Sequence, residues 1–168
     1  MARRSNEARE VSGLGDAIDD AGATLDLQQY FPYRLALLAE QVSLAVAEVY
    51  GDRFSLSRQE WRILAALGTR ALLPTKEIGR LTTLDKMNVS RAMQSLEARG
   101  IVSRTRDPED GRERLVALTS AGRTLYRKIV PYALAAEASL LAALTPREAA
   151  MLDVVMRILS AAASNETE

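Results

Sequence analysis

The sequence predicts a mainly α-helical protein with one small β-hairpin, in which helices from both ends of the chain flank a compact central unit. Apolar residues recur at helical spacing from residue 26 to about residue 160. Two capping boxes, SRQE and TPRE, mark helix starts. The segment DPEDG separates two short β-prone runs, and it is typical of a turn because proline fixes φ and glycine accepts a positive φ.

The N-terminal part of the chain is predicted to be an arm followed by one long helix. Residues 1–25 are polar and rich in small residues, which favours a mobile arm, with a helix that clasps a partner subunit as the alternative. In residues 26–54 the apolar stripe is wide, as in a helix buried on more than one side. Pro32 is tolerated in the first turn of this helix, and Gly51–Asp52 is its expected end.

The central unit, residues 55–118, is predicted to contain three helices and the hairpin. Ser57 and Glu60 cap the first helix, Pro74 and Thr75 open the second, and a turn at residues 82–85 leads into the third. Gly68 is expected to close the first helix, and Gly100 to end the third in a left-handed conformation. The hairpin pairs residues 101–102 with residues 115–118. The residues expected to point inward are Trp61, Leu64, Leu67, Ile78, Leu81, Val89, Ala92, Met93 and Leu96.

Residues 119–162 are predicted to form two more helices, followed by a frayed tail at residues 163–168. Thr119 caps the first helix, which runs to about Leu144 with a kink at Pro131, and the second capping box, Thr145–Glu148, opens the last helix. The helices of 26–54 and 119–162 are too apolar to face solvent, and three helices make a thin bundle. We therefore predict that a second copy of the chain completes a dimerisation lobe around a two-fold axis.

The composition excludes several classes of protein. The 168 residues include no cysteine and no histidine, which removes disulfides, thiolate metal sites and the commonest general base. No nucleophile elbow or phosphate loop occurs, so we expect no enzyme and no cofactor or metal. There is no run of about 18 apolar residues and no signal-peptide core, so we expect a cytoplasmic protein without a membrane partner.

Charge and polarity single out the third helix of the central unit and the hairpin. The formal net charge is zero, so a DNA-binding face would have to concentrate its cations locally. The helix carries a polar face suited to base edges and phosphates, and the hairpin lifts arginines away from the body, as a wing that enters a narrow groove does. Together they predict a winged helix-turn-helix, with an ordinary solvated helix face and turn as the alternative. The helix residues expected to face DNA are Lys86, Asn88, Ser90, Arg91 and Gln94.

Several segments resemble the MarR family of ligand-responsive bacterial transcriptional regulators, over roughly residues 30–160. They are LSRQEWRILAAL, TKEIGRLT, DKMNVSRAMQSLEARGIVSR and DPEDGRERLVALTSAG. The most specific feature is the pairing of DKxxVSRAxxxLExxG with the wing pattern DxxDxRxxxxxLTxxG. The resemblance implies a homodimer whose recognition helices enter successive major grooves of double-stranded DNA. It implies a pseudo-palindromic operator, with half-sites about 10 bp apart.

The same resemblance implies roles for further residues. Thr75 and Lys76 would touch phosphates, and Arg112 would be the wing arginine, braced by Asp107 and Asp110, with Arg114 on the adjoining strand. An Asp that orders the fork of an Arg before binding lowers the entropy lost on docking.

Family members commonly respond to small anionic or aromatic molecules, so the resemblance implies a repressor released by an acid or its CoA thioester. Candidate pocket residues are Tyr33, Arg34 and Trp61, because an aromatic face beside a guanidinium suits a planar carboxylate. Alternatively, Trp61 belongs to the core and Arg34 to a surface or interface salt bridge. The absence of cysteine and histidine argues against oxidation and metal sensing. The competing function is an accessory or architectural DNA-binding protein without an effector.

Overall fold

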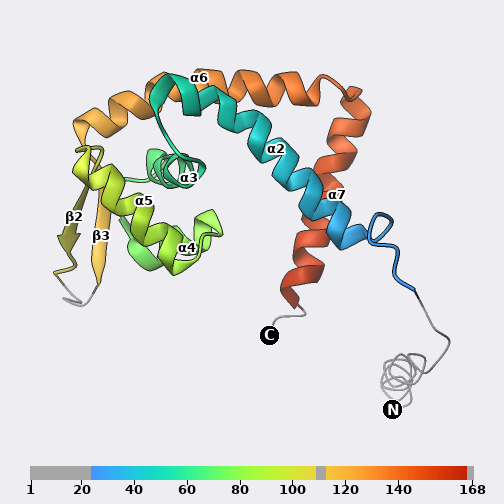
Figure 1. Ribbon diagram of the computed structural model, residues 1–168, viewed down its shortest axis with the longest axis horizontal. Helices are drawn as coiled ribbons and strands as arrows, with labels where there is room; N and C mark the ends of the chain where they lie inside the picture. Colours follow the sequence, from blue (N-terminus) through green and yellow to red (C-terminus); the bar gives the residue numbers. More distant parts are fainter. Residues whose placement is uncertain (1–23, 109–112, 166–168) are drawn as a thin grey trace, which may run out of the picture. The chain divides into compact units, whose positions relative to one another are not determined.

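The structure, a computed structural model, describes residues 24–108 and 113–165 (Figure 1). The fold is mainly helical with a small sheet, as the sequence predicts. The chain divides into two units, residues 1–39 and 40–168, which are described separately. Most of the predicted N-terminal arm, the tip of the hairpin and the end of the tail lie outside the described residues. In chain order the elements are α2 (Phe31–Phe54), α3 (Arg58–Gly68), β1 (Leu73–Pro74), α4 (Thr75–Thr82), α5 (Lys86–Ala98), β2 (Val102–Arg106), β3 (Arg114–Leu118), α6 (Ser120–Leu141) and α7 (Pro146–Asn165).

In the first unit, residues 24–39 are described, and they comprise a short turn and the beginning of α2. The turn is held at Asp26, whose carboxylate accepts a hydrogen bond from the Gln28 amide at 2.9 Å and whose carbonyl accepts one from the Tyr30 amide at 3.0 Å. Pro32 lies in the first turn of α2, as the sequence predicts. The described side chains of this unit are exposed.

The prediction that the first long helix ends at Gly51–Asp52 is wrong. The helix continues to Phe54, and the Gly51 carbonyl accepts a hydrogen bond from the Ser55 amide at 2.9 Å. Glycine is disfavoured inside a helix but does not by itself stop one. The chain instead turns at Ser55, whose φ of 50° is left-handed. This conformation costs a residue other than glycine on the order of 1–2 kcal/mol.

Helix α3 begins with the predicted capping box and ends against α6. The Ser57 hydroxyl accepts from the Glu60 amide at 3.2 Å, and the Glu60 carboxylate accepts from the Ser57 amide at 2.6 Å. Leu64 and Leu67 are buried as expected, whereas Trp61 is half-buried. Gly68 closes the helix as predicted, but its role there is close packing, because a Cβ at this position would come within 2.2 Å of the Tyr126 ring.

Helices α4 and α5 form the predicted helix-turn-helix, with one error in the buried face of α4. Ile78 is buried, but Leu81 is 38% exposed and Thr82 is buried in its place. The Thr82 hydroxyl donates to the Ile78 carbonyl at 2.7 Å, so this polar side chain is satisfied within its own helix. Gly100 has the predicted left-handed conformation, with φ 66°. All four α5 residues expected to point inward are buried: Val89, Ala92, Met93 and Leu96.

The sheet has three antiparallel strands in the order β1-β3-β2. The hairpin pairs β2 with β3 from Val102 opposite Leu118 to Arg106 opposite Arg114. The sequence did not predict β1, whose Leu73 lies opposite Val116. This short strand ties the start of α4 to the hairpin, so α4 and the hairpin share one backbone framework.

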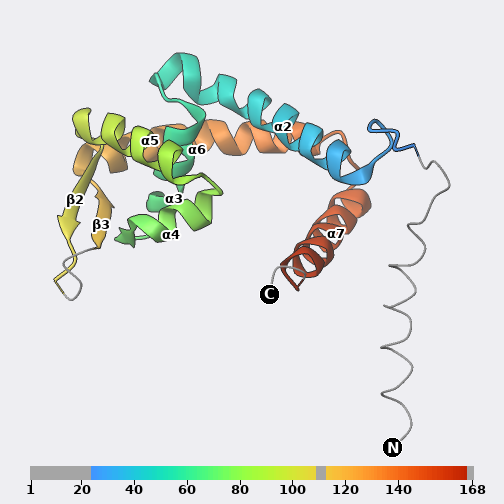
Figure 2. The ribbon, with the colours of Figure 1, turned by 60° about the horizontal axis from the view of Figure 1, so that its bottom comes forward.

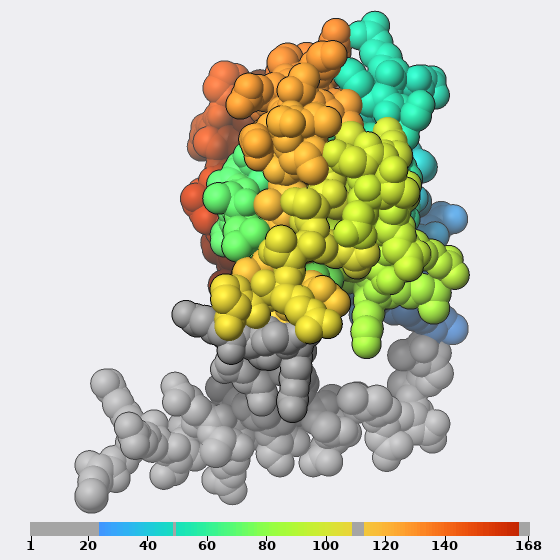
Figure 3. All heavy atoms as spheres, turned by 90° about the vertical axis from the view of Figure 1, so that its left-hand side faces the viewer, coloured from blue at the N-terminus to red at the C-terminus, as the bar shows by residue number. Residues whose placement is uncertain are grey.

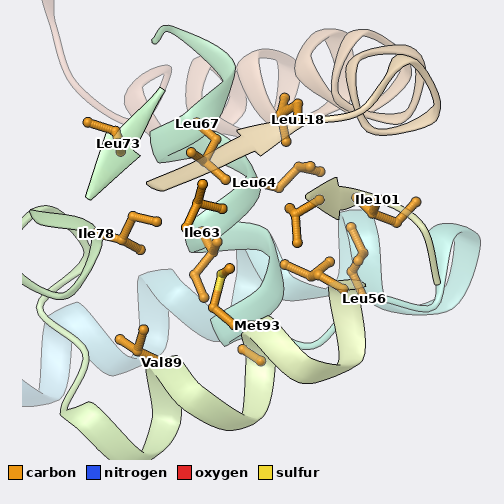
Figure 4. Close-up of a cluster of buried hydrophobic side chains, with 14 of the residues drawn as sticks. Leu56, Ile63, Leu64, Leu67, Leu73, Ile78, Val89, Met93, Ile101 and Leu118 are labelled. Carbon is orange, nitrogen blue, oxygen red and sulfur yellow. The ribbon is translucent and has the colours of Figure 1, made fainter. Parts of the chain in front are cut away.

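The core of the second unit lies where the end of α2, which contributes Tyr50, meets α3, α4, α5, the sheet and the first half of α6 (Figure 4). Its largest fully buried side chains come from every one of these elements, so a single apolar cluster fixes the helix-turn-helix against the hairpin. They include Ile63, Leu64, Leu67, Ile78, Met93, Leu96, Val116 and Ile129.

The C-terminal helices have the predicted caps but leave much apolar surface exposed. The Thr119 hydroxyl accepts from the Gly122 amide at 3.0 Å, and Thr145 and Glu148 form the second capping box. Helix α6 ends at Leu141, three residues before the expected end, and Pro131 lies inside it. No single described helix is long and apolar enough to cross a membrane, and only α6 and α7 taken together, with a bend of 107°, meet that test by length and composition. The large exposed side chains include Leu134, Leu140, Met151, Val155, Met156 and Ile158.

Candidate nucleic-acid interface

Helix α5 has one buried face and one polar face. Four apolar residues, Val89, Ala92, Met93 and Leu96, pack into the core and fix the helix, whereas Met87 is exposed with most of the polar side chains. In the space-filling view, the surface of α5 adjoins the surface of β2 on one side of the molecule (Figure 3). Four of the five residues predicted to face DNA are exposed on this helix: Lys86, Ser90, Arg91 and Gln94.

Asn88, the fifth residue, is half-buried and forms part of the helix cap. Asp85 accepts a hydrogen bond from the Asn88 backbone amide at 2.8 Å and another from its side-chain amide at 2.7 Å. These hydrogen bonds lower the pKa of Asp85, chiefly the one from the Asn88 backbone, so the carboxylate stays charged at the helix N-terminus. Asn88 thus fixes the first turn of α5, and a base contact would require its side chain to leave Asp85.

The start of α4 is tied to the hairpin. The Thr75 hydroxyl donates to the Arg114 carbonyl at 3.1 Å, so this half-buried side chain joins α4 to β3. Lys76 is exposed on the next position. Arg80, one turn further on, is exposed and makes two hydrogen bonds to Glu77, of 2.7 and 2.8 Å.

The hairpin carries arginines along both strands and lies beside α5 in both ribbon views (Figures 1 and 2). Arg104 on β2 pairs with Glu97 of α5, and its Nε lies 2.8 Å from the carboxylate. This hydrogen bond and the Arg104 charge lower the pKa of Glu97. Arg106 and Arg114 are exposed and directly opposite each other across the strands.

The tip of the predicted wing is described only at its edges. Asp107 is half-buried, and its amide donates to the Glu113 carbonyl at 3.1 Å. Asp110 and Arg112 lie outside the described residues, so the predicted bracing of Arg112 by Asp107 and Asp110 stays a prediction.

A groove of about 560 Å³ runs between α4, α5 and β2, and we call it the α4–α5 groove. Four cationic side chains and two hydroxyls line it together with apolar residues, and two of the cations, Arg80 and Arg104, are paired with carboxylates. Arg80 and Arg104 were not among the predicted site residues, because only the fold brings them beside α5. The lining includes Lys76, Arg80, Lys86, Arg104, Thr75 and Ser90.

Trp61, the predicted pocket residue of the second unit, lies between two tyrosines. Its ring stacks on Tyr50 at 5.5 Å and on Tyr126 at 6.4 Å between centroids. Trp61 also borders a groove of about 490 Å³ between α3 and the end of α4, which we call the α3–α4 groove and which Arg62 and Arg70 line as well. Its ring is thus mainly a packing element that contributes to the wall of this groove.

Tyr33 and Arg34, the other two predicted pocket residues, belong to the first unit. Both lie on α2 and are exposed there. Their joining with Trp61 into one pocket stays a prediction. Among the described residues, no group of three or more metal-binding side chains is positioned to hold a metal ion.

The chain is similar to known transcriptional regulators. The sequence profile of the MarR family matches residues 54–113. The helix-turn-helix transcriptional regulator YwoH of Bacillus subtilis is 36% identical over 91 residues, which cover 54% of this chain and 66% of that protein. The chain spans between 50% and 66% of the length of the curated relatives it matches, and all of these are named as transcriptional regulators rather than enzymes.

Solved structures match a larger share of the chain. A MarR family transcriptional regulator from Silicibacter pomeroyi is 30% identical, with a TM-score of 0.71 over 83% of this chain and 98% of that chain. The PcaV regulator from Streptomyces coelicolor, solved in complex with its natural ligand, is 26% identical, with a TM-score of 0.67 over 83% of this chain and 99% of that chain. The similarity therefore extends beyond the helix-turn-helix to the flanking helices.

Proposed function

We propose that this chain, which belongs to the MarR family, is a cytoplasmic, dimeric transcriptional regulator that binds a specific DNA site and is released by a small planar anion. The observation that carries this proposal is the division of α5 into two faces. Its apolar face is locked into the core, while Lys86, Ser90, Arg91 and Gln94 face solvent beside the arginine-bearing hairpin. Such a helix can enter a major groove without disturbing the fold.

The surroundings of α5 support contacts to the DNA backbone. Lys76 and Lys86 of the α4–α5 groove and the exposed Arg106 and Arg114 of the hairpin place positive charge beside the polar face of α5, whereas Arg80 and Arg104 are paired with Glu77 and Glu97. Phosphate contacts position a protein on the duplex, and contacts to base edges then select the sequence. We assign backbone contacts to Lys76, Arg106 and Arg114, and base contacts chiefly to Arg91 and Gln94.

The exposed apolar surface of α2, α6 and α7 supports assembly with a second copy. Five large apolar side chains on these helices are each 54–59% exposed: Leu38, Leu44, Leu134, Met151 and Met156. Apolar surface on three helices is unfavourable in water and marks an association site. A two-fold dimer would bury it and set two copies of α5 about one helical turn of DNA apart.

The proposal is tested by titrating the chain onto the intergenic DNA next to its own gene, with footprinting and light scattering. We expect a particle of twice the chain mass that protects one site of about 20–30 bp. Binding without a discrete footprint, and with a steep salt dependence, would instead indicate an accessory DNA-binding protein. A monomer at micromolar concentration would contradict the half-site geometry.

Replacing Arg91 with alanine is expected to weaken specific binding by about 1–3 kcal/mol and to relax sequence preference. Arg91 is exposed on the polar face of α5, so the free energy of unfolding should change by less than about 0.5 kcal/mol. DNA-shift titrations with the specific site and a scrambled site measure the affinity and the sequence preference. Arg157→Gln on α7, where Arg157 pairs with Asp153, is the control. Unchanged affinity for both DNAs would show that this face does not read bases.

The α3–α4 groove supports the choice of a planar anion as effector. It is bordered by Trp61 and contains the guanidinium groups of Arg62 and Arg70. Arg62 is partly engaged, because its Nη1 lies 3.5 Å from the Thr82 carbonyl, whereas Arg70 is exposed. Because tyrosines stack on the Trp61 ring, we assign recognition to the carboxylate–guanidinium contact rather than to stacking on Trp61.

Replacing Arg70 with glutamine is expected to weaken effector binding about tenfold while leaving DNA affinity without effector unchanged. Trp61 is the only tryptophan of the chain, so its fluorescence reports ligand binding in a titration with aromatic acids and their CoA esters. An effector that favours the DNA-free state by about 1–3 kcal/mol would lower DNA affinity about 5- to 150-fold. Equal effector affinity in the variant and in wild type would place the effector elsewhere.

A further inference from the structure

A polar network joins the C-terminal end of α5 to the segment between α2 and α3, which we call the α2–α3 joint. The joint consists of Phe54, Ser55 and Leu56, and Ser55 holds it in a left-handed conformation. Arg99, the C-cap of α5, donates from Nη1 to the Ser55 carbonyl at 2.9 Å and from Nη2 to the Phe54 carbonyl at 3.3 Å. One side chain thus caps two adjacent carbonyls that are far from it in sequence.

Glu60 completes this network from the first turn of α3. Its side chain is 7% exposed, and the carboxylate lies 3.6 Å from Nη1 of Arg99. Burial raises the pKa of Glu60, but hydrogen bonds from Ser95 and Ser57, together with the Arg99 charge, lower it further than burial raises it. The carboxylate is therefore charged although it is buried, and it pairs with the guanidinium that caps the two joint carbonyls.

Helix α5 contributes two members of the network, four residues apart on one side of the helix. These are Ser95 and Arg99, next to the buried Leu96. Apolar packing fixes which face of α5 is buried, but the hydrophobic effect is itself non-directional. A planar guanidinium that bridges two carbonyls and a carboxylate has a fixed geometry. The network therefore adds a directional constraint on the orientation of α5 relative to the joint.

On the basis of the proposed function, we propose that Arg99 is a positioning residue that couples the α2–α3 joint to the recognition helix. A change in the direction of α2 at Ser55 would be passed through Arg99 to the end of α5. Arg99 acts through the orientation of α5 and not by touching DNA, and Glu60 holds it in place.

Two conservative variants test the coupling. Arg99→Lys keeps the positive charge but loses the fork that bridges the joint carbonyls. Glu60→Gln keeps an acceptor for the capping box, in which glutamine replaces glutamate well, but loses the charge that faces Arg99. We expect each variant to weaken specific DNA binding at least fivefold, with an unchanged salt dependence, since no phosphate contact is lost. The double variant should have an affinity for the specific DNA site within about twofold of that of the weaker-binding single variant.

Arg58→Gln is the matched control. Arg58 also forms an ion pair across the joint, with Glu40 of α2 at 2.7 Å, but this pair does not involve α5. This variant should retain wild-type DNA affinity within twofold. Urea unfolding establishes whether each variant is folded. If Arg99→Lys or Glu60→Gln does not fold, Ser95→Ala, which removes only a hydroxyl from the network, is used in its place.

A distance measurement tests the coupling without DNA. The chain has no cysteine, so spin labels can be attached at Glu48→Cys on α2 and Gln94→Cys on α5, with unlabelled protein added to dilute the labels in a dimer. We expect Arg99→Lys to broaden or shift the distance distribution, and Arg58→Gln to leave it as in wild type. An unchanged distribution in Arg99→Lys, or an equal change in Arg58→Gln, would overturn the proposal. Absence of specific DNA binding by the wild-type chain would instead overturn the proposed function, and the distance result would still decide the coupling.

Discussion

Replacing Gly122 with alanine is expected to destabilise the fold by at least about 2–3 kcal/mol. A Cβ at this position would lie 2.1 Å from the carbonyl oxygen of Ile101, a backbone atom that cannot swing aside as a flexible side chain can. The Ile101 carbonyl also accepts a hydrogen bond from the Thr119 amide at 3.1 Å, so moving it would disturb the cap of α6. The clash would separate the start of α6 from the segment that leads into β2.

Urea unfolding, followed by Trp61 fluorescence, measures this loss. Gly51→Ala is a matched control, because a Cβ on Gly51 would have no atom within 4 Å and Gly51 lies inside α2. The control should be neutral or more stable by about 0.5–1 kcal/mol. If the two variants unfolded at the same urea concentration, the close approach of Gly122 to Ile101 would be refuted.

Replacing Leu64 with alanine is expected to lower the free energy of unfolding by about 2–5 kcal/mol. Leu64 is 0% exposed and lies at the centre of the cluster in which α3 contacts the other elements of the core (Figure 4). Because the core fixes α5, the variant should also bind DNA more weakly near its unfolding temperature, while binding approaches wild-type affinity on cooling.

Calorimetric or chemical unfolding checks the stability, and DNA titration at several temperatures checks the consequence. Leu72→Ala is the control, since Leu72 is 47% exposed and its truncation should change stability by less than about 0.5 kcal/mol. A loss below about 1 kcal/mol for Leu64→Ala would mean that α3 is not central to the core.

The features that could be predicted from the sequence are those set by neighbouring residues. Both capping boxes were found because a box needs only a Ser or Thr and a Glu three positions later. The buried face of α5 followed from periodicity, and Gly100 from its place after the last periodic residue. The MarR resemblance rested on these same segments, and the comparisons confirm it.

The errors arose where tertiary contacts override local preference. Gly51 suggests a helix end locally, yet α2 continues and turns at Ser55. Leu81 looks like a core residue, but the buried position at the end of α4 belongs to Thr82, whose hydroxyl donates a hydrogen bond to the Ile78 carbonyl. Strand β1 is two residues long and contains a proline, so it has no periodicity to detect.

Part of the candidate site could not be predicted because it depends on contacts between distant segments. Arg80 and Arg104 line the α4–α5 groove only once two helices and a strand are assembled. The capping role of Glu60 was evident from its neighbours, but its pairing with Arg99 was not, since 39 positions separate the two residues. Asn88 looked like a base-reading residue, and its engagement with Asp85 emerges only from the geometry of the cap.

The facing pair Arg106 and Arg114 makes the free hairpin electrostatically unfavourable at low ionic strength, because like charges opposite each other weaken a strand pair. A polyanion laid across these strands would relieve this repulsion, and part of the binding free energy would then originate inside the protein. Dissolved salt screens the repulsion before any partner arrives. The affinity of the hairpin for a phosphate chain should therefore fall more steeply with added salt than expected from the number of counterions that the protein displaces from that chain.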